Sequence, residues 1–251
     1  MNLFLSMLIL MTAFIQSVQA EQSLINYPPY NAASTEILLK TEGEIDNEKY
    51  IITMFSDNQK NISPTIHFLK VNGKSLELIA VIDVNENTSS YQFKINNNSL
   101  YIKTTTAHDG VYFSQYQFKK KNDGFYLIGV EAQSISPTTF TLDSDNSEHS
   151  LEMWDGLSVN FLTSKAECWL ETFDLESGEK NKAWKQWRAA LTKLDKGKRS
   201  TNAISRTISF KRVNLEPLDK FDTYNINYPF TCYFDHNKRF HGSTTSIPHS
   251  L

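Results

Sequence analysis

Short apolar runs separated by tight-turn residues are the feature that most constrains the fold of this chain. The run 65–71 leads into Asn72-Gly73, and a second run follows at 76–84. An Asn-Gly pair between two such runs is a strong signal for a β-hairpin. Two further pairs of runs have the same arrangement: 91–95 with 100–103, and 111–118 with 125–131. Hairpins in series predict a mainly β fold of antiparallel hairpins that form a sandwich, a barrel or a propeller-like set of sheets.

A faint internal repeat supports this fold class. Phe68-Leu-Lys-Val-Asn72 and Leu78-Ile-Ala-Val81 are similar to Phe118-Lys-Lys-Lys-Asn122 and Leu127-Ile-Gly-Val130, at an offset of about fifty residues. Two copies indicate duplicated sheet modules, and the alternative is that hairpins resemble one another by chance. Further strands are expected at 51–55, 203–213 and 228–234, and a loose tail from Lys238 onward.

One amphipathic helix is predicted near 179–195. Trp184, Trp187, Leu191 and Leu194 fall on one stripe at spacings of three, four and three residues. Basic side chains fill most of the remaining surface of this segment. Gly197 follows as a stop signal.

The first twenty residues predict a secretory signal peptide. They carry no charged side chain, are apolar from Leu3 to Ile15, and place Val18 and Ala20 before a cleavage site at Glu21. The apolar run is too short for a permanent transmembrane anchor. The sequence thus predicts a periplasmic or secreted protein with one β-rich domain at 21–251. The alternative is a β domain at 35–175 followed by a helix-and-strand subdomain at 176–251.

Cys168 and Cys232 are the two cysteines of the chain. An exported protein meets an oxidising compartment, and neither cysteine lies in a Cys-x-x-Cys redox motif. We therefore expect a structural disulfide between them. Two buried free thiols are the alternative.

Charge is segregated along the chain. Residues 21–177 carry a net charge of −11, residues 178–212 carry +9, and the whole chain carries −3. Five residues of the helix are candidates for binding a partner: Lys180, Trp184, Lys185, Trp187 and Arg188. They favour an acidic protein, an anionic envelope component or an anionic membrane surface. The alternative is that the tryptophans cover the sheet and the cations are solvated. Nucleic acid is a poor candidate partner for an exported chain of negative net charge.

Most catalytic signatures are absent from the sequence. There is no Gly-x-Ser-x-Gly elbow, no His-Glu-x-x-His pair, no phosphate loop and no dinucleotide fingerprint. His236 and His241 lie close to Asp235, but they read as exposed tail residues. His67 lies in an expected strand and reads as structural. We predict no metal site and no cofactor.

Three segments carry a resemblance to a known group. They are Tyr116-Gln-Phe118 with Asn122-Asp-Gly124-Phe-Tyr-Leu127-Ile128-Gly129, then Leu157-Ser-Val-Asn160-Phe161-Leu162-Thr163-Ser-Lys165, and Val213-Asn-Leu215-Glu-Pro-Leu218-Asp-Lys-Phe221. They resemble uncharacterised exported β-rich proteins of Gram-negative bacteria, which have no established activity. Ser164 stands where that pattern has glycine, so this turn is expected to differ. The resemblance implies a periplasmic or secreted β-rich protein.

These observations favour a non-catalytic exported binding protein, such as an envelope-resident antidote to a toxin, because charge segregation suits the steering of a partner. The first alternative is an envelope glycan or ester hydrolase with a carboxylate pair that the sequence does not locate. The second is a protein that associates with anionic membranes through its Trp/Lys helix.

Overall fold

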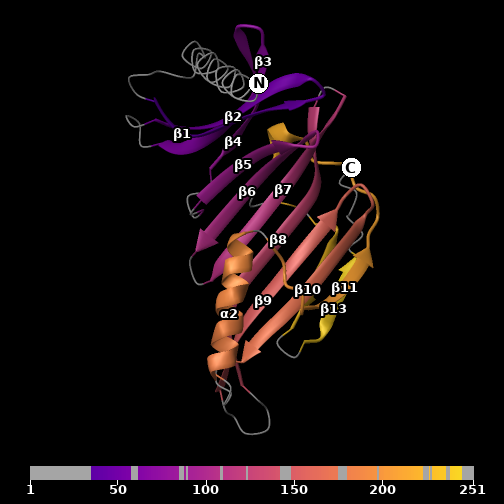
Figure 1. Cartoon of the computed structure of the whole chain (residues 1–251). Helices are drawn as coiled ribbons and strands as arrows, with labels where there is room; N and C mark the ends of the chain where they lie inside the picture. The colour runs from indigo at the N-terminus through magenta and orange to yellow at the C-terminus, as the bar shows by residue number, and fades with distance from the viewer. Residues whose placement is uncertain are drawn as a thin grey trace, which may run out of the picture. The chain divides into compact units, whose positions relative to one another are not determined.

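The computed structural model describes residues 35–57, 62–84, 88, 90–107, 110–122, 124–141, 148–174, 180–196, 198–222, 226, 228–235 and 238–244. The predicted leader, 1–20, lies outside these residues. The chain divides into two compact units: Met1–Val84 with Ile95–Asn97, and Asn85–Lys94 with Asn98–Leu251. Within the described residues, the predicted mainly β, antiparallel fold with one α-helix is confirmed (Figure 1).

The first unit contains a four-stranded antiparallel sheet in which chain neighbours are also sheet neighbours. Two-residue turns join its first two and its last two strands. The backbone φ angle is positive at Asp46 (52°), Asn47 (63°) and Gly73 (62°). Asp, Asn and Gly adopt this conformation more readily than other residues, which is why such residues mark hairpin turns. The strands are β1 (Thr35–Ile45), β2 (Glu48–Asp57), β3 (Ile62–Asn72) and β4 (Ser75–Asp83).

The core of the first sheet lies on its two central strands. Ile51, Phe55 and Leu69 form one buried cluster. The Tyr50 and Phe68 rings stack with their centroids 5.4 Å apart. These side chains belong to β2 and β3, the two strands with a neighbour on each side. The predicted strand 51–55 and the predicted Asn-Gly hairpin are both confirmed here.

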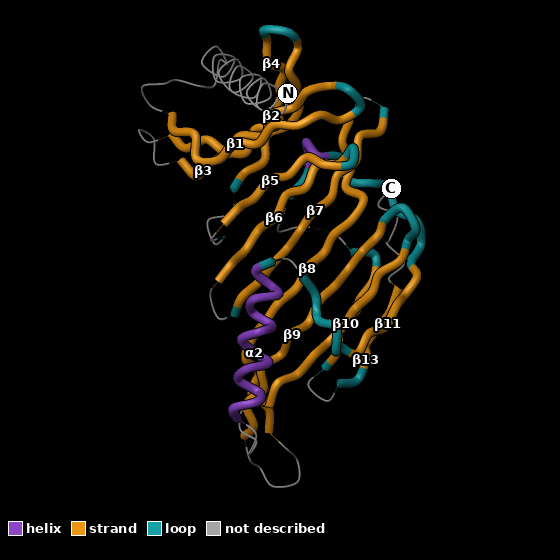
Figure 2. Tube along the Cα trace, viewed as in Figure 1, coloured by secondary structure: helices purple, strands orange, loops and turns teal. Residues whose placement is uncertain are grey.

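The second unit is built on a seven-stranded antiparallel sheet with the order β11-β10-β9-β8-β7-β6-β5 (Figure 2). The other two predicted hairpins are present as β5 with β6 and β7 with β8. The predicted strand at 203–213 is shorter, as β11. The strands are β5 (Ser90–Asn96), β6 (Ser99–Ala107), β7 (Val111–Lys121), β8 (Gly124–Thr141), β9 (Glu148–Asn160), β10 (Lys165–Asp174) and β11 (Ile204–Ser209).

The repeated sequence motif corresponds to a repeated backbone irregularity. In the β3–β4 hairpin the pairing skips Ile79, and in the β7–β8 hairpin it skips Ile128. Both residues occupy the second position of the Leu-Ile-x-Val motif. A bulge increases the local twist of a strand pair, so both hairpins have the same local distortion.

Helix α2 (Lys180–Asp195) packs on one face of the second sheet and confirms the predicted helix. Ala190 and Leu194 are buried against Trp154, Trp169 and Phe113. Burial of this apolar stripe stabilises the helix, because short helices are marginal in isolation.

A two-stranded hairpin lies against the opposite face of that sheet. It comprises β12 (Phe230–Phe234) and β13 (Phe240–Thr244). The predicted disulfide is present and joins Cys168 of β10 to Cys232 of β12, with Cα atoms 6.0 Å apart. Phe234 is buried against Cys168, and Phe240 packs on the same cluster. The prediction of a loose tail from Lys238 is therefore wrong for β13, because a strand partner and core contacts stabilise it.

Several strands have no counterpart in the predictions. The predicted strands do not include β1, β9 or β10, and the strand predicted to end at Glu131 continues, as β8, to Thr141. These strands contain polar residues on both faces, so alternation of apolar and polar residues does not mark them. Asp46-Asn47 was an available turn signal for the hairpin of β1 with β2. A short 3₁₀ helix, η1 (Leu218–Lys220), precedes Phe221, whose ring packs on Tyr116 and Phe118 with centroids 4.9 Å away.

Candidate functional site

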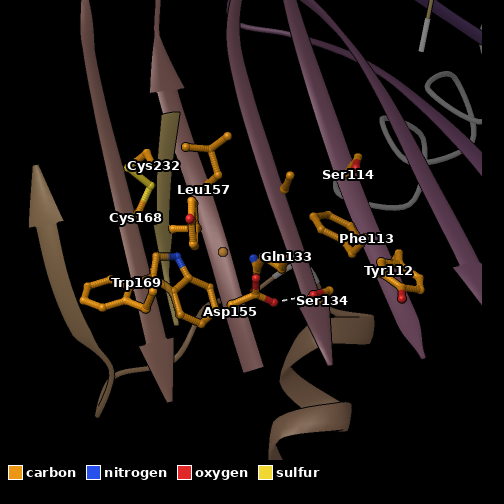
Figure 3. Close-up of a pocket in the computed structure, with 14 residues that line it drawn as sticks. Tyr112, Phe113, Ser114, Gln133, Ser134, Asp155, Leu157, Cys168, Trp169 and Cys232 are labelled. Atoms are coloured by element: carbon orange, nitrogen blue, oxygen red, sulfur yellow. Dashed lines mark hydrogen bonds between the residues drawn. A yellow bond between two sulfur atoms is a disulfide. The ribbon is translucent and has the colours of Figure 1, made fainter. Parts of the chain in front are cut away.

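A cavity of about 250 Å³ lies where β12 faces the middle of the second sheet (Figure 3). Four neighbouring strands, β7 to β10, supply its floor, and β12 supplies a wall. Its residues are mostly apolar or aromatic with a few polar groups, which is the usual composition of a ligand pocket. They are Tyr112, Phe113, Ser114, Ala132, Gln133, Ser134, Asp155, Gly156, Leu157, Cys168, Trp169, Cys232, Tyr233 and Phe234.

Three polar residues of this cavity come from one row of the sheet. Tyr112 pairs with Ser134, and Ser134 pairs with Asp155. Residues in one row of a sheet point to the same face, because side chains alternate along each strand. This face is the one that carries Cys168 and therefore the disulfide-linked hairpin.

Asp155 accepts a hydrogen bond from the Ser134 hydroxyl, and Figure 3 shows the carboxyl of one strand turned toward the serine of the next. Burial raises the pKa of the Asp155 carboxyl, and the bond from Ser134 opposes that shift. No lysine or arginine within the described ranges forms an ion pair with it. The pocket thus holds a largely buried carboxyl without a counter-cation in the described residues.

Aromatic and sulfur groups surround this carboxyl. Tyr112 lies on the same face of the sheet as Asp155 and is 37% exposed, so its ring borders the opening of the pocket. Tyr233 lies between Cys232 and Phe234 on β12, so its ring points away from the sheet, where it stacks on His241. Cys168 and Leu157 stand on the floor, and Phe234 is buried beside the disulfide. The disulfide therefore keeps β12, and with it one wall of the pocket, against the sheet.

The neighbouring row of the sheet points to the helix-covered face. It contains Phe113, Gln133, Gly156 and Trp169. Gln133 is 3% exposed, and neither amide atom has a hydrogen-bond partner among the described residues. The Trp169 indole N–H also lacks a partner there. Unpaired buried polar atoms are uncommon in proteins and destabilise the fold.

A second polar group lies on the same helix-covered face. Glu131 and Glu167 stand in one row with Ser158 between them. Arg199 holds Glu167 through two hydrogen bonds, of 2.7 and 3.0 Å, and these bonds lower the pKa of that carboxyl. Burial raises the pKa of Glu131. The pKa of Glu131 thus lies above the ordinary value for a glutamate, and the pKa of Glu167 lies below it.

The predicted partner-binding residues all lie in α2, and those with described side chains differ in exposure. Lys185 and Arg188 are exposed, whereas Trp187 is half-buried and packs against the Trp154–Trp169 cluster. Lys180 and Trp184 belong to the first turns of the helix, and their side chains lie outside the described part of the chain. Trp187 thus packs on the core with part of its surface, which counts against a pair of exposed tryptophans lying on a membrane.

The remaining sequence candidates are structural where they are described. His241 lies on β13 and its Nε2 is 2.9 Å from Asp235 Oδ2, while His236 lies outside the described residues. Among the described residues, no group of three or more His, Cys, Asp or Glu side chains is placed to hold a metal ion. No helix in the described ranges is long and apolar enough to cross a bilayer.

Sequence reasoning missed the pocket itself. The available signal was Trp154-Asp155-Gly156, where an acid and a glycine interrupt a run of strand-forming residues. Glycine inside a strand marks a site that another group approaches closely. The pocket also needs β12, which is distant in sequence, and no local pattern places β12 beside Asp155.

Comparison with protein-family models, with curated proteins and with solved structures gives no match for this chain.

Proposed function

We propose that this chain is a non-catalytic binding protein that acts outside the cytosol, and that its pocket beside the disulfide receives a lysine or arginine side chain of a basic protein partner. The observation that supports this most directly is the Asp155 carboxyl, which is largely buried and lacks a counter-cation in the described residues. A charged carboxylate in such a place is stabilised when a cation pairs with it.

The pocket also offers partners for the rest of a cationic side chain. The ring of Tyr112 borders the opening and supplies a face for a cation–π contact. Leu157 and Phe234 contact the aliphatic stem of a lysine or arginine. A buried pocket that accepts one long side chain is typical of an interface hot spot.

Long-range charge favours a basic partner as well. Residues 21–177, which contain most of the pocket, carry a net charge of −11. Such a potential accelerates association with a basic protein and disfavours acidic competitors. An envelope-resident antidote to a basic toxin fits this profile, and the disulfide fits an oxidising compartment.

The chemistry of the pocket favours binding over hydrolysis. Its described residues include one carboxyl group, Asp155, whereas glycoside hydrolysis uses two. The Ser134 hydroxyl donates to that carboxyl, and no described histidine lines the cavity to activate it as a nucleophile.

The test is a titration of the mature chain with the peptide acetyl-Gly-Arg-Gly-amide, followed by NMR. The citrulline peptide is the neutral control, since it has nearly the same shape. We expect the arginine peptide to shift the signals of Ser134 and Tyr233 and the citrulline peptide to bind at least about tenfold more weakly. Affinity should rise with pH as Asp155 ionises.

Asp155→Asn should abolish the preference for arginine, because it removes the charge and keeps the shape of the side chain. Asp219→Asn is the matched control, since this exposed aspartate lies on η1 outside the pocket. Equal binding of the arginine and citrulline peptides to the unmodified chain would exclude the proposed role of Asp155.

A hydrolase acting on envelope glycans or esters is the second candidate, and Glu131 with Glu167 favours it. Two carboxyl groups whose surroundings move their pKa values apart are the usual pair for acid and base roles. Glu131 would be the acid. Release of dye from stained peptidoglycan by the mature chain, lost in Glu131→Gln and retained in Asp155→Asn, would establish this function instead.

A further inference from the structure

A second cavity lies at the turn between β7 and β8, apart from the Asp155 pocket. Its volume is about 340 Å³, which is in the range of small-ligand sites. Lys121 and Asn122 lie at the turn, and Tyr126 lies at the start of β8. The segment 212–215 forms the other side: Arg212, Val213, Asn214 and Leu215.

Backbone contacts fix the two sides of this cavity against each other. Leu127 N–H donates to the Glu216 carbonyl at 2.8 Å, and Tyr126 forms a β-bridge with Pro217. Segments that are distant in sequence therefore face each other. The Tyr126 ring lies beside Gly124, where an added Cβ would be 3.2 Å from the ring, so this ring has a defined place in the wall.

The described residues that line this cavity carry positive charge and no negative charge. Lys121 and Arg212 line it, and no acidic side chain does so among the described residues. Neither cation has a hydrogen bond or ion pair with another described residue. Two cations that line one hollow, with no counter-anion in the part of the chain that is described, are a favourable arrangement for an anionic ligand, and arginine suits a carboxylate or phosphate group in particular.

The remaining lining groups define the ligand further. Asn122 and Asn214 each offer an amide donor and acceptor, which match hydroxyl groups. Tyr126 offers an aromatic face for a sugar ring. We propose that this pocket binds an anionic saccharide, with Lys121 and Arg212 on its carboxylate or phosphate and the two asparagines on its hydroxyls. This site is independent of the proposed function of the Asp155 pocket.

The experiment is calorimetry of the mature chain at low salt with trigalacturonic acid, with its methyl ester as the uncharged control. Glucose 6-phosphate is a second probe and distinguishes a phosphate from a carboxylate as the preferred anion. We expect at least one anionic sugar to bind with a Kd below about 1 mM, and the methyl ester to bind at least about tenfold more weakly.

Lys121→Gln with Arg212→Gln should weaken binding of the anionic sugar by at least about tenfold. Lys211→Gln is the matched control, since this exposed cation adjoins Arg212 but does not line the cavity. It should change affinity by less than about twofold. Unchanged far-UV circular dichroism and unfolding midpoints verify that the variants are folded.

Three outcomes would overturn the proposal. The first is no binding of either anionic sugar at millimolar concentration. The second is an equal loss of affinity in Lys211→Gln, which would mean diffuse attraction instead of a site. The third is equal binding of a triglutamate peptide, which would assign the pocket to acidic protein segments. Asp155→Asn should leave sugar binding unchanged. A failure of the saccharide proposal can therefore be distinguished from a failure of the proposed function of the Asp155 pocket.

Discussion

The indole ring of Trp169 on β10 lies over Gly156 on β9, in the place that a side chain at Gly156 would fill. A Cβ added at Gly156 would overlap Cε2 and Cζ2 of the ring. Trp169 is 1% exposed and packs edge-on against Trp154, with centroids 5.4 Å apart. The ring cannot move without disturbing the core beneath α2.

Gly156→Ala should therefore destabilise the fold by about 1–3 kcal/mol, the usual cost of overpacking a core. Urea unfolding followed by tryptophan fluorescence measures this change. Gly129→Ala is the matched control in the same sheet, because its added Cβ would meet its nearest neighbours at ordinary contact distances. If both variants unfold at the same urea concentration, the contact with Trp169 does not restrict the size of the side chain at position 156.

Removing the disulfide should destabilise the chain and open the pocket. The bond closes a segment with a sequence separation of 64, so the double variant Cys168→Ala, Cys232→Ala should lose about 4 kcal/mol in the chain-entropy model. Urea unfolding measures the loss. Proteolysis should cut the β12–β13 segment faster in the variant, and cleavage at the wild-type rate would show that the packing of Phe234 and Phe240 is sufficient to hold the hairpin.

The raised pKa of Asp155 gives stability a specific pH dependence. Because burial raises the folded-state pKa above the ordinary value of 3.8, the folded chain binds more protons than the unfolded chain in the interval between the two values. This carboxyl therefore makes the fold less stable as pH rises through that interval. Asp155→Asn should remove this decrease. The free energy of unfolding of the variant, relative to that of the wild type, should therefore increase as pH rises from about 4. A constant difference would contradict the shift.

His67 should give the opposite slope in the first unit. Burial lowers its folded-state pKa below 6.5, while its ring contacts Phe55 edge-on and its Nε2 lies 3.0 Å from Thr65 Oγ1. The unfolded chain binds more protons in that interval, so stability is lost as pH falls below 6.5 toward the folded-state pKa. His67→Gln should flatten this part of the stability profile. An NMR titration that gives His67 a pKa of 6.5 or above would contradict this prediction.

Ser164→Gly should stabilise the turn between β9 and β10. Ser164 has a φ angle of 53°, in the left-handed region that glycine adopts without strain. We expect a gain of about 0.5–1 kcal/mol after the larger backbone entropy of glycine is included. Ser164→Ala is the control and should show no gain, because it keeps the Cβ. Thermal unfolding compares the three chains.

Local sequence patterns were sufficient for three of the hairpins and for the helix, but not for the hairpins β1–β2 and β9–β10. Asn72-Gly73 marks a turn because its backbone conformation depends on few neighbours, and the structure has a hairpin there. The stripe through Trp187, Leu191 and Leu194 predicts α2 because helical periodicity is also local. The Cys168–Cys232 bond followed from cysteine number and the expected compartment.

The candidate sites depended on contacts that no local pattern contains. Asp155 lines a pocket only because β12 packs against the sheet, and Arg212 and Lys121 line one cavity only because the segment 212–215 lies beside the β7–β8 turn. The same holds for β13. Its sequence predicts a loose tail, whereas in the structure Phe240 packs against the cluster that contains Cys168 and Phe234. Sequence by itself thus determined the local elements, since their geometry arises from neighbouring residues. Tertiary structure decided the pockets, since they arise from side chains that packing brings together across long separations.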